Sequence, residues 1–525
     1  MLMKRTGYRV GKEGAEGKDS RQNGRVLRRE MADTVGSVKE ALGHSPDLIV
    51  RTFLMRGEPQ VQVAVIYIDG LTDKEKVNDF IMQSLWGAPT ETDLTAAKAD
   101  CIGVFKEILA RATTVGGVMV RTDWNDMMHS LLSGDIVILV DGCAEAIIGD
   151  LRGGSWRAIA EPTTEVTVRG PKDSFIESIQ TNVSLIRRRL KNPNLWVEPM
   201  TIGHSSKTDI AIVYVRGVAE DRLVQEVKQR LSAIRIDAIQ GSGYIEELIR
   251  DQTITPFPTL YSTERPDMAV GQLLEGRVAI VVDGTPFTLS VPTNFSQFLK
   301  STEDYYLRFH FAVFMRIVRY ASFFILLLLP SIYIAVTTFH HEMIPTILVI
   351  NLLAQREGIP FPAFFEALLM EVSFEIMREA GVRMPRAVGQ AVSIVGAIVL
   401  GSAAVEAGVV TAMMVIVVSL TGIASFATPG VQLNNAVRVI RFPMMILAST
   451  FGFYGVMMGM IFLVAHMTSL KSFGVPYLYP FSPFDPRRQE DTIWRSSIRT
   501  SRTRPDLSAK QEGLSDASEG KRQDS

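Results

Sequence analysis

An uncharged apolar run constrains this chain more than any other feature. Tyr320 to Phe339 reads YASFFILLLLPSIYIAVTTF and carries no formal charge. A helix of about 20 apolar residues is long enough to cross the hydrocarbon core of a bilayer. The chain has 525 residues, of which 47% are hydrophobic. The excess lies after residue 310, because the first 300 residues alternate apolar and charged stretches. The sequence therefore predicts a soluble region followed by an all-α transmembrane bundle.

Composition excludes several classes of protein. The net charge of −1 gives no bias toward nucleic acid. Two cysteines, Cys101 and Cys143, cannot build a disulfide framework and are typical of a reducing compartment. Residues 1–35 are rich in Gly, Lys and Arg, which predicts a disordered basic arm. That arm holds no apolar core of a signal peptide, so we expect the first membrane helix to direct insertion.

The soluble region repeats itself. Residues 63–70 read VAVIYIDG and residues 210–217 read IAIVYVRG, each a β-branched run that ends in glycine. Residues 131–142 read LLSGDIVILVDG, and residues 273–284 read LLEGRVAIVVDG. Both pairs recur in the same order at an offset of about 145 residues, which is typical of a duplicated domain rather than a solenoid. Two similar α/β subdomains are therefore predicted.

Domain boundaries follow from the duplication. We expect subdomain 1 over residues 36–160 and subdomain 2 over 161–305, with a linker at EPTTEVTVRGPKD, Glu161 to Asp173. Asp141-Gly142 and Asp283-Gly284 each stand between two apolar strands, so they predict tight hairpin turns. No Cys/His cluster, catalytic triad or paired-carboxylate motif appears, so neither a metal, a cofactor nor an enzymatic activity is expected.

The membrane domain is expected over residues 306–470. It contains four clear apolar runs, at Tyr320–Phe339, Ala387–Ala404, Met413–Ala427 and Met444–Leu470, plus an interrupted segment at 344–378. Three arginines precede the first run, which predicts that the α/β region is cytoplasmic. They are Arg308, Arg316 and Arg319. The side of the tail, residues 471–525, stays open; its aromatic and then charged composition predicts an interfacial patch followed by disorder.

The interrupted segment carries three carboxylates. Ionisable groups inside a membrane usually mark an ion or substrate route. Glu371 and Glu375 stand four residues apart and share one helix face, whereas Glu366 points away. They are our candidates for a cation pathway. The alternative is that Glu375 merely pairs with Arg378 at the end of an amphipathic helix.

Small residues recur every four positions in the next apolar run. They form one stripe of a helix, along which a second helix can approach closely. The stripe consists of Gly389, Ser393, Ala397 and Gly401. It predicts either self-association of the chain or ordinary packing within one chain.

Four long strings in the chain are distinctive. They are RTDWNDMMHSLLSGDIVILVDG (121–142), TEVTVRGPKDSFIESIQTNVSLIRRRLKNPNL (164–195), YSTERPDMAVGQLLEGRVAIVVDGTPF (261–287) and IPFPAFFEALLMEVSFEIMREAGVRMPRAVGQAVSIVGAIVLG (359–401). On these strings, residues 36–490 resemble a known family, the A subunits of the GerA-type spore germination receptors of endospore-forming bacteria. The soluble strings are shared by the stage V sporulation membrane protein, but the last string resembles the receptor branch.

This resemblance implies a multi-pass subunit in the spore inner membrane. Its partners would be a transporter-like B subunit, which senses nutrient, and a lipoprotein C subunit. A subunits of this family are thought to oligomerise into a germinant-gated ion channel. The alternatives are a secondary transporter subunit and a sporulation-specific membrane channel of the same family. The sequence names neither the nutrient nor the size of an oligomer, and the basic arm and charged tail depart from the family pattern.

Overall fold

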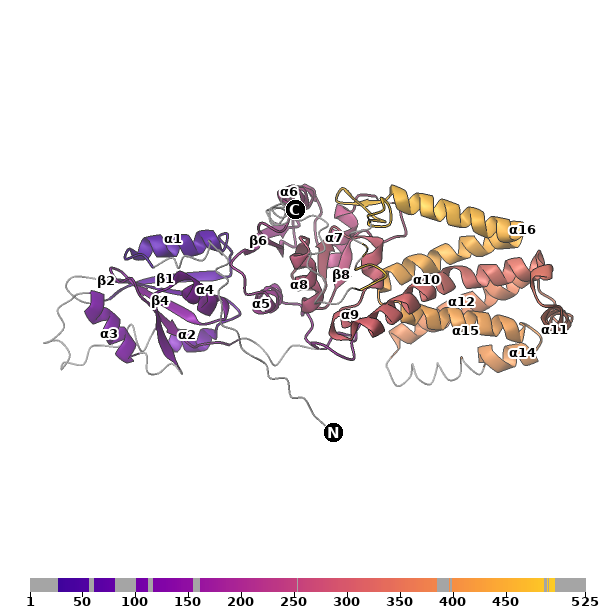
Figure 1. The fold of residues 1–525 in the computed structure, drawn as a ribbon, viewed down its shortest axis with the longest axis horizontal. Helices are drawn as coiled ribbons and strands as arrows, with labels where there is room; N and C mark the ends of the chain where they lie inside the picture. The colour runs from indigo at the N-terminus through magenta and orange to yellow at the C-terminus, as the bar shows by residue number, and fades with distance from the viewer. Residues whose placement is uncertain are drawn as a thin grey trace, which may run out of the picture. The chain divides into compact units, whose positions relative to one another are not determined.

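The computed structural model describes residues 27–55, 61–80, 101–111, 117–153, 161–252, 254–384, 396, 399–485, 489 and 491–495 (Figure 1). The chain divides into two compact units. The first comprises residues up to Ala41 together with Leu48–Gly153, and the second comprises Leu42–Asp47 together with the chain from Gly154 onward.

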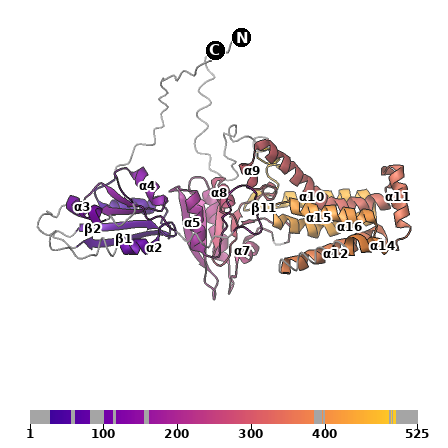
Figure 2. The ribbon, with the colours of Figure 1, turned by 90° about the horizontal axis from the view of Figure 1, so that it is seen from below.

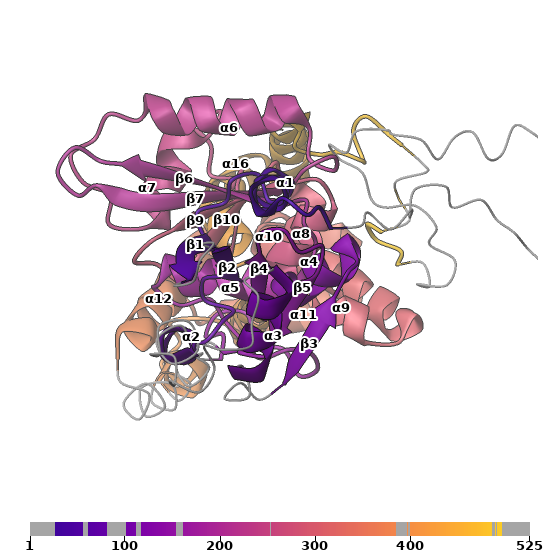
Figure 3. The same cartoon turned by 90° about the vertical axis from the view of Figure 1, so that its left-hand side faces the viewer.

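The first unit is subdomain 1, a five-stranded antiparallel sheet with helices on both faces. Its strands are β1 (Leu48–Met55), β2 (Val61–Ile68), β3 (Val118–Arg121), β4 (Ile136–Val140) and β5 (Ala146–Gly149), and its helices are α1 (Met31–Ala41), α2 (Lys74–Phe80), α3 (Cys101–Arg111) and α4 (Trp124–Leu132). The strand order is β1-β2-β4-β5-β3, as Figure 3 shows. Alternate residues of β2 and β4 pack against α2 and α3 on one face.

The second unit begins with subdomain 2, which repeats this arrangement. Its strands are β6 (Leu195–Ile202), β7 (Thr208–Val215), β8 (Tyr261–Thr263), β9 (Val278–Val282) and β10 (Thr288–Val291), and its helices are α5 (Ile179–Arg189), α6 (Asp221–Ala233), α7 (Ser242–Ile249) and α8 (Pro266–Leu274). The order β6-β7-β9-β10-β8 matches that of subdomain 1. Helices α6 and α7 cover one face of the sheet, and α5 and α8 cover the other.

The predicted duplication is confirmed by strand positions. The strings VAVIYIDG and IAIVYVRG form β2 and β7, and the paired LLSGDIVILVDG and LLEGRVAIVVDG strings form β4 and β9. These strands hold equivalent places in sheets of identical order. The repeated strings therefore encode one fold twice.

The two Asp-Gly turns show why the strings resemble each other so closely. Gly142 and Gly284 adopt φ values of 86° and 80°, which glycine reaches without strain. Asp141 Oδ1 accepts a hydrogen bond from the backbone N–H of Met31 at 3.1 Å, and Asp283 Oδ1 accepts one from that of Ile179 at 3.0 Å. Each aspartate thus fixes the first residue of a helix, α1 or α5, whose leading N–H groups lack partners inside the helix.

Helix α1 corrects one boundary. The arm was expected to extend to residue 35, but α1 begins at Met31, whose side chain is buried together with those of Thr34 and Val38. Burial of this apolar side and the Asp141 contact stabilise a helix that composition alone does not reveal. Residues 1–26 of the expected arm lie outside the described residues.

The helical region follows subdomain 2 in the same unit. Subdomain 2 ends with η4 (Phe295–Leu299) and α9 (Glu303–Tyr306). The elements of the helical region are α10 (Phe309–Thr338), η5 (His341–Met343), α11 (Thr346–Arg356), α12 (Ala363–Arg383), the π-helix η6 (Val399–Ala403), α14 (Ala404–Glu406), α15 (Ala412–Ala427) and α16 (Val431–Ser469). Among the described helices, α10 and α16 are long and apolar enough to cross a membrane. Helices α11 and α15 are apolar but shorter.

Helix α16 is a hairpin of two helical arms rather than one rod. Its backbone is non-helical at Gly452, where φ is 60° and ψ is −140°. A Cβ atom on Gly459 would stand 2.4 Å from the sulfur of Met444, so the second arm packs closely against the first. Figure 1 shows the two arms meeting at the turn and diverging toward subdomain 2. The apolar run expected from Met444 to Leu470 is therefore divided between both arms.

Both arms of α16 meet subdomain 2 at their open ends. Gly430, just before the first arm, lies against Phe298 of η4. His466, near the end of the second arm, makes a 3.0 Å hydrogen bond with Thr255 Oγ1. The turn at Gly452 contacts Phe339 and His340, which follow α10. Helix α10 thus runs from the end of the helical region near subdomain 2 to the far end.

The first part of the tail packs on the α/β fold. Short strands β11 (Lys471–Ser472) and β12 (Val475–Pro476) pair with each other. Ser472 Oγ donates to Thr259 O at 2.6 Å, and the fully buried Tyr477 packs with Phe257 and Phe295. The aromatic segment expected as an interfacial patch therefore contributes to a protein core. Residues 496–525 lie outside the described residues.

We expect Gly452→Ala to destabilise the hairpin. An alanine would be strained at this positive φ, and its Cβ would stand 2.8 Å from His340 Cε1. Together these effects should cost about 1–3 kcal/mol and lower the midpoint of thermal unfolding in detergent. Gly381→Ala in α12 is the control, because a Cβ there meets nothing within 4 Å. Equal midpoints for the two variants would contradict the strained turn.

Candidate functional site

Two predicted carboxylates meet two arginines inside the helical region. Glu371 and Glu375 lie on the same side of α12, as their spacing predicted. Glu371 Oε2 is 2.7 Å from Arg441 Nη2, and Glu375 Oε1 is 3.3 Å from the same nitrogen. Glu375 also accepts from both Arg438 Nε, at 2.8 Å, and Arg438 Nη2. We call these four side chains the charge cluster.

Burial makes the pairing in the charge cluster obligatory. Glu371 and Arg441 are almost fully buried, and an ionised group removed from water is costly unless an opposite charge accompanies it. The formal charges of two glutamates and two arginines cancel. The partners of Glu375 come from α16, whereas the guanidinium of Arg378 lies 5.9 Å from the ring centroid of Phe426. The charge cluster therefore links α12 to α16.

Glu366 belongs to a separate polar network at the far end of α12. Its Oε1 accepts from the backbone N–H of Thr411 at 2.5 Å and from the Thr411 hydroxyl. Thr411 is the N-cap of α15, and Tyr333 of α10 lies 3.2 Å from its hydroxyl oxygen. The carboxylate sits at the start of α15, where the helix dipole favours negative charge. Glu366 thus joins three helices.

The small-residue stripe is mostly undescribed. Gly389, Ser393 and Ala397 lie outside the described residues. Gly401 falls in the π-helix η6, and a Cβ built on it would meet nothing within 4 Å. Within the part of the chain that the structure describes, a larger side chain at Gly401 would therefore meet no neighbour at its Cβ. Self-association through the stripe stays a prediction.

A second buried ionic cluster lies where the helical region begins. Asp304 of α9 is fully buried. One of its oxygens is 3.0 Å from Arg316 Nε, and both are 2.8 Å from Arg319 Nη1. Both arginines lie on the first turns of α10 and are buried. One aspartate thus fixes the start of α10 to the end of the α/β fold.

The tail adds a second acid to this junction. We call the described part of residues 471–495 the C-terminal strap. Asp491 in the strap is 2.9 Å from Arg316 Nη1 and 3.1 Å from Lys300 Nζ. Burial of the Asp491 carboxyl favours a higher pKa, but Lys300 and Arg316 outweigh burial and lower the pKa to about 2. The stabilisation is complete above its ordinary pKa of 3.8 and is lost as pH falls toward 2.

The linker between the subdomains reaches the same junction. Glu264 accepts from the backbone N–H of Thr163 at 2.9 Å, and Arg265 donates to the Pro171 carbonyl at 3.0 Å. Gly170 lies against the ring of Tyr306, whose hydroxyl donates to Asp267 at 2.9 Å. The linker, subdomain 2 and the start of α10 are therefore joined by direct contacts.

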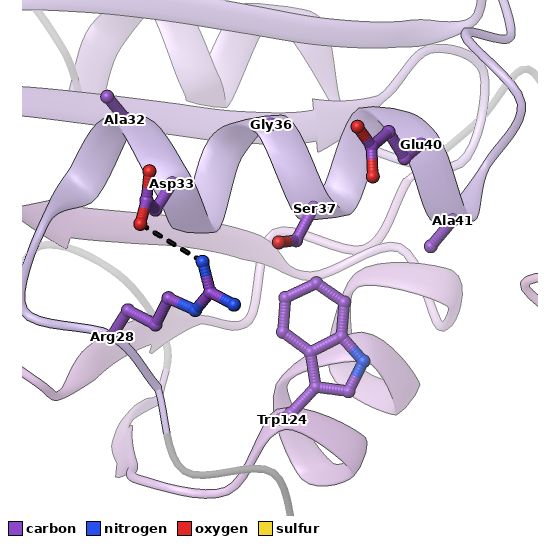
Figure 4. A pocket seen from close by; sticks show the side chains of 8 residues that line it. All are labelled: Arg28, Ala32, Asp33, Gly36, Ser37, Glu40, Ala41 and Trp124. Carbon is purple, nitrogen blue, oxygen red and sulfur yellow. Dashed lines mark hydrogen bonds and ion pairs between the residues drawn. The ribbon is translucent and has the colours of Figure 1, made fainter.

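Subdomain 1 carries a shallow pocket of about 500 Å³ between α1 and the start of α4 (Figure 4). Trp124 faces α1, and Arg28 pairs with Asp33 at 3.0 Å beside it. The equivalent place in subdomain 2 is filled. Ser37 and Leu185 hold the same position in the equivalent helices α1 and α5. Leu185 is buried and packs with α8, whereas Ser37 is small and leaves the space open. The pocket therefore results from divergence between the two copies.

Sequence reasoning identified the carboxylates but missed their partners. Arg438, Arg441 and Asp304 were not candidates, although Arg438 and Arg441 interrupt an apolar stretch three residues apart, which places them on one helix face. Like the four-residue spacing of Glu371 and Glu375, this three-residue spacing puts both charges on one side of a helix. Among the described residues, no group of three or more His, Cys, Asp or Glu side chains could hold a metal ion.

Comparison with known proteins identifies the family. Residues 36–507 match the family described as Bacillus/Clostridium GerA spore germination protein. This chain belongs to the GerA family.

Two relatives from Bacillus subtilis (strain 168) align along most of this GerA-family protein. Spore germination protein KA is 48% identical over 92% of this chain and 87% of the relative. The uncharacterized membrane protein YfkQ is 44% identical over 84% of each chain. A crystal structure of the N-terminal domain of the A subunit of the Bacillus megaterium spore germinant receptor GerK3 is 39% identical, with a TM-score of 0.42, over 52% of this chain and 99% of that one.

We expect Arg441→Met to destabilise this GerA-family protein by about 3–5 kcal/mol, because it leaves Glu371 buried without a cation. Adding Glu371→Gln should restore most of the loss, since no unpaired charge then remains. Adding Glu375→Gln instead should restore less, because Glu375 keeps Arg438 as its partner. The midpoint of thermal unfolding in detergent is measured for the single variant and for both double variants. Equal rescue by both second changes would contradict the assigned pairs.

Proposed function

We propose that this GerA-family protein is the A subunit of a nutrient-responsive spore germination receptor in the spore inner membrane. Its partners are a transporter-like B subunit and a lipoprotein C subunit, and several copies assemble into a germinant-gated ion channel. The chain catalyses no reaction in this role. The observation that carries the proposal is the charge cluster, because paired ionisable groups inside a membrane bundle usually serve an ion route.

The distribution of cations supports a cytoplasmic α/β region. Arg316 and Arg319 start α10, Arg438 lies in the first arm of α16 near subdomain 2, and Lys471 follows the second arm. Pairing of Glu375 with Arg438 brings the C-terminal half of α12 toward the same end. Lys and Arg concentrate on the cytoplasmic side of membrane proteins. The C-terminal strap, which packs on subdomain 2, then lies in the cytoplasm as well.

In this proposal the charge cluster holds the closed state. Arg438 and Arg441 neutralise both glutamates, so no net negative charge is free to attract a cation. Displacement of α12 along α16 separates the pairs and turns Glu371 and Glu375 toward a shared pathway. Carboxylates released in several subunits would form a ring, which favours cations. The junction at Asp304 would transmit motion of the α/β region to α10.

We expect Glu371→Gln and Glu375→Gln to alter the rate or ion selectivity of germinant-triggered potassium release from spores. Glu379→Gln is the matched control on α12, because Glu379 is exposed and pairs only with the exposed Arg383 among the described residues. Immunoblots verify equal abundance of the subunit. Release at the normal rate and selectivity in both test variants would remove the charge cluster from the pathway.

Oligomer formation is tested at the small-residue stripe. A leucine at Gly401 or Ala397 would separate helices that pack backbone to backbone. We expect Gly401→Leu to reduce crosslinked oligomers in membranes, whereas Gly381→Leu, also at a position where a Cβ meets nothing, should not. An unchanged oligomer in Gly401→Leu would assign the stripe to packing within one chain.

A further inference from the structure

The short apolar helix α11 runs in a different direction from α10 and α16 (Figure 2). It joins the end of α10 to the start of α12 at the end of the helical region far from subdomain 2, and it runs across the axes of α10 and α16 (Figure 2). Its 11 residues extend about 16 Å, which is half the thickness of a hydrocarbon core. Helix α11 therefore cannot span a membrane.

The side chains of α11 divide into three sides. Leu352 is buried and Val349 half-buried, and these two residues, three apart, face the protein. Asn351 and Gln355, four apart, form an exposed polar side. A third side, which we call the apolar stripe, consists of Ile347, Ile350 and Leu353, whose exposed fractions are 78%, 60% and 54%.

An apolar stripe of this kind is unfavourable in water. Each Ile or Leu that is left fully exposed loses the favourable free energy of burial, about 1.5–3 kcal/mol. A short helix that combines one apolar and one polar side is instead typical of a position in the plane of a membrane surface, where its apolar side enters the headgroup–acyl boundary.

Aromatic side chains are exposed at the same end of the helical region as α11, the end far from subdomain 2. Phe339 follows α10, Phe361 precedes α12, and Phe451 and Tyr454 flank the Gly452 turn, which touches Phe339. All four are exposed. Aromatic rings concentrate at membrane boundaries. Exposed aromatic side chains therefore lie at both ends of the connection that contains α11 and at the neighbouring Gly452 turn.

We propose that α11 is an interfacial helix whose apolar stripe binds the lipid surface on the membrane side opposite the α/β region. The stripe anchors the connection between α10 and α12, so the far ends of both helices are fixed at the membrane boundary. The inference uses the membrane embedding of the helical region and is independent of channel activity.

The test places an environment-sensitive fluorophore on α11 of the full chain. Cys101 and Cys143 are first replaced by serine, and Ile350→Cys or the matched control Gln355→Cys is labelled. The protein is reconstituted into vesicles of phosphatidylethanolamine and phosphatidylglycerol. We expect a nitroxide near the start of the acyl chain to quench the Ile350 probe at least roughly twofold more than the Gln355 probe, with aqueous iodide giving the reverse order.

Either of two results would overturn the inference. Iodide quenching of the Ile350 probe equal to that of the Gln355 probe would place the apolar stripe in water. Shielding of the Ile350 probe from both quenchers would mean that protein, such as a second copy, covers the stripe. Ile347→Cys provides a second position on the stripe if the Ile350 variant fails to fold, as judged by elution and helical circular dichroism.

Discussion

The arrangement of this protein depends on the neutralisation of two buried arginines at the start of α10. Arg316 and Arg319 lie where the α/β fold meets the membrane helices, and Asp304 accepts hydrogen bonds from both. Because a buried guanidinium without an acid is strongly destabilising, the first turns of α10 cannot leave Asp304 without a large cost in free energy. The C-terminal strap adds Asp491 to the same site. The chain thus returns, after its last membrane helix, to the point where its first one begins.

This ionic junction is embedded in one continuous apolar core. Phe257, Phe298 and Tyr477 of the α/β side share that core with Phe323 of α10 and Met444 of α16. Closely packed interiors transmit displacement because they have few voids to absorb it. Subdomain 2 and the membrane helices therefore share one packed core. In the proposed function, the charge cluster between α12 and α16 is the polar contact that separates during gating.

The two α/β subdomains differ in the side chains and segments that pack on their helices and sheets. Subdomain 2 fills the space between α5 and α8 with Leu185, and the linker and the C-terminal strap pack on it. Subdomain 1 has Ser37 at the equivalent place and keeps an open pocket beside Trp124. Both copies nevertheless retain the aspartate that fixes the first residue of a helix, Asp141 or Asp283. The same aspartate contact is therefore kept in both copies, although the residues that cover the sheets differ.

The sequence by itself determined the features that are written in local periodicity. It gave the apolar run of α10, the repeated strands of the two subdomains, the common face of Glu371 and Glu375, and strings specific enough to indicate the GerA family. Only the tertiary structure decided which cations those carboxylates meet, because Arg438 lies 63 residues from Glu375 and their contact depends on how two helices pack. The hairpin at Gly452 was equally hidden, since one glycine at positive φ reverses the chain without any charged residue in the apolar run. Hydrophobic periodicity specifies that a helix forms. Which other helix it packs against depends on pairing buried charges that lie far apart in the sequence.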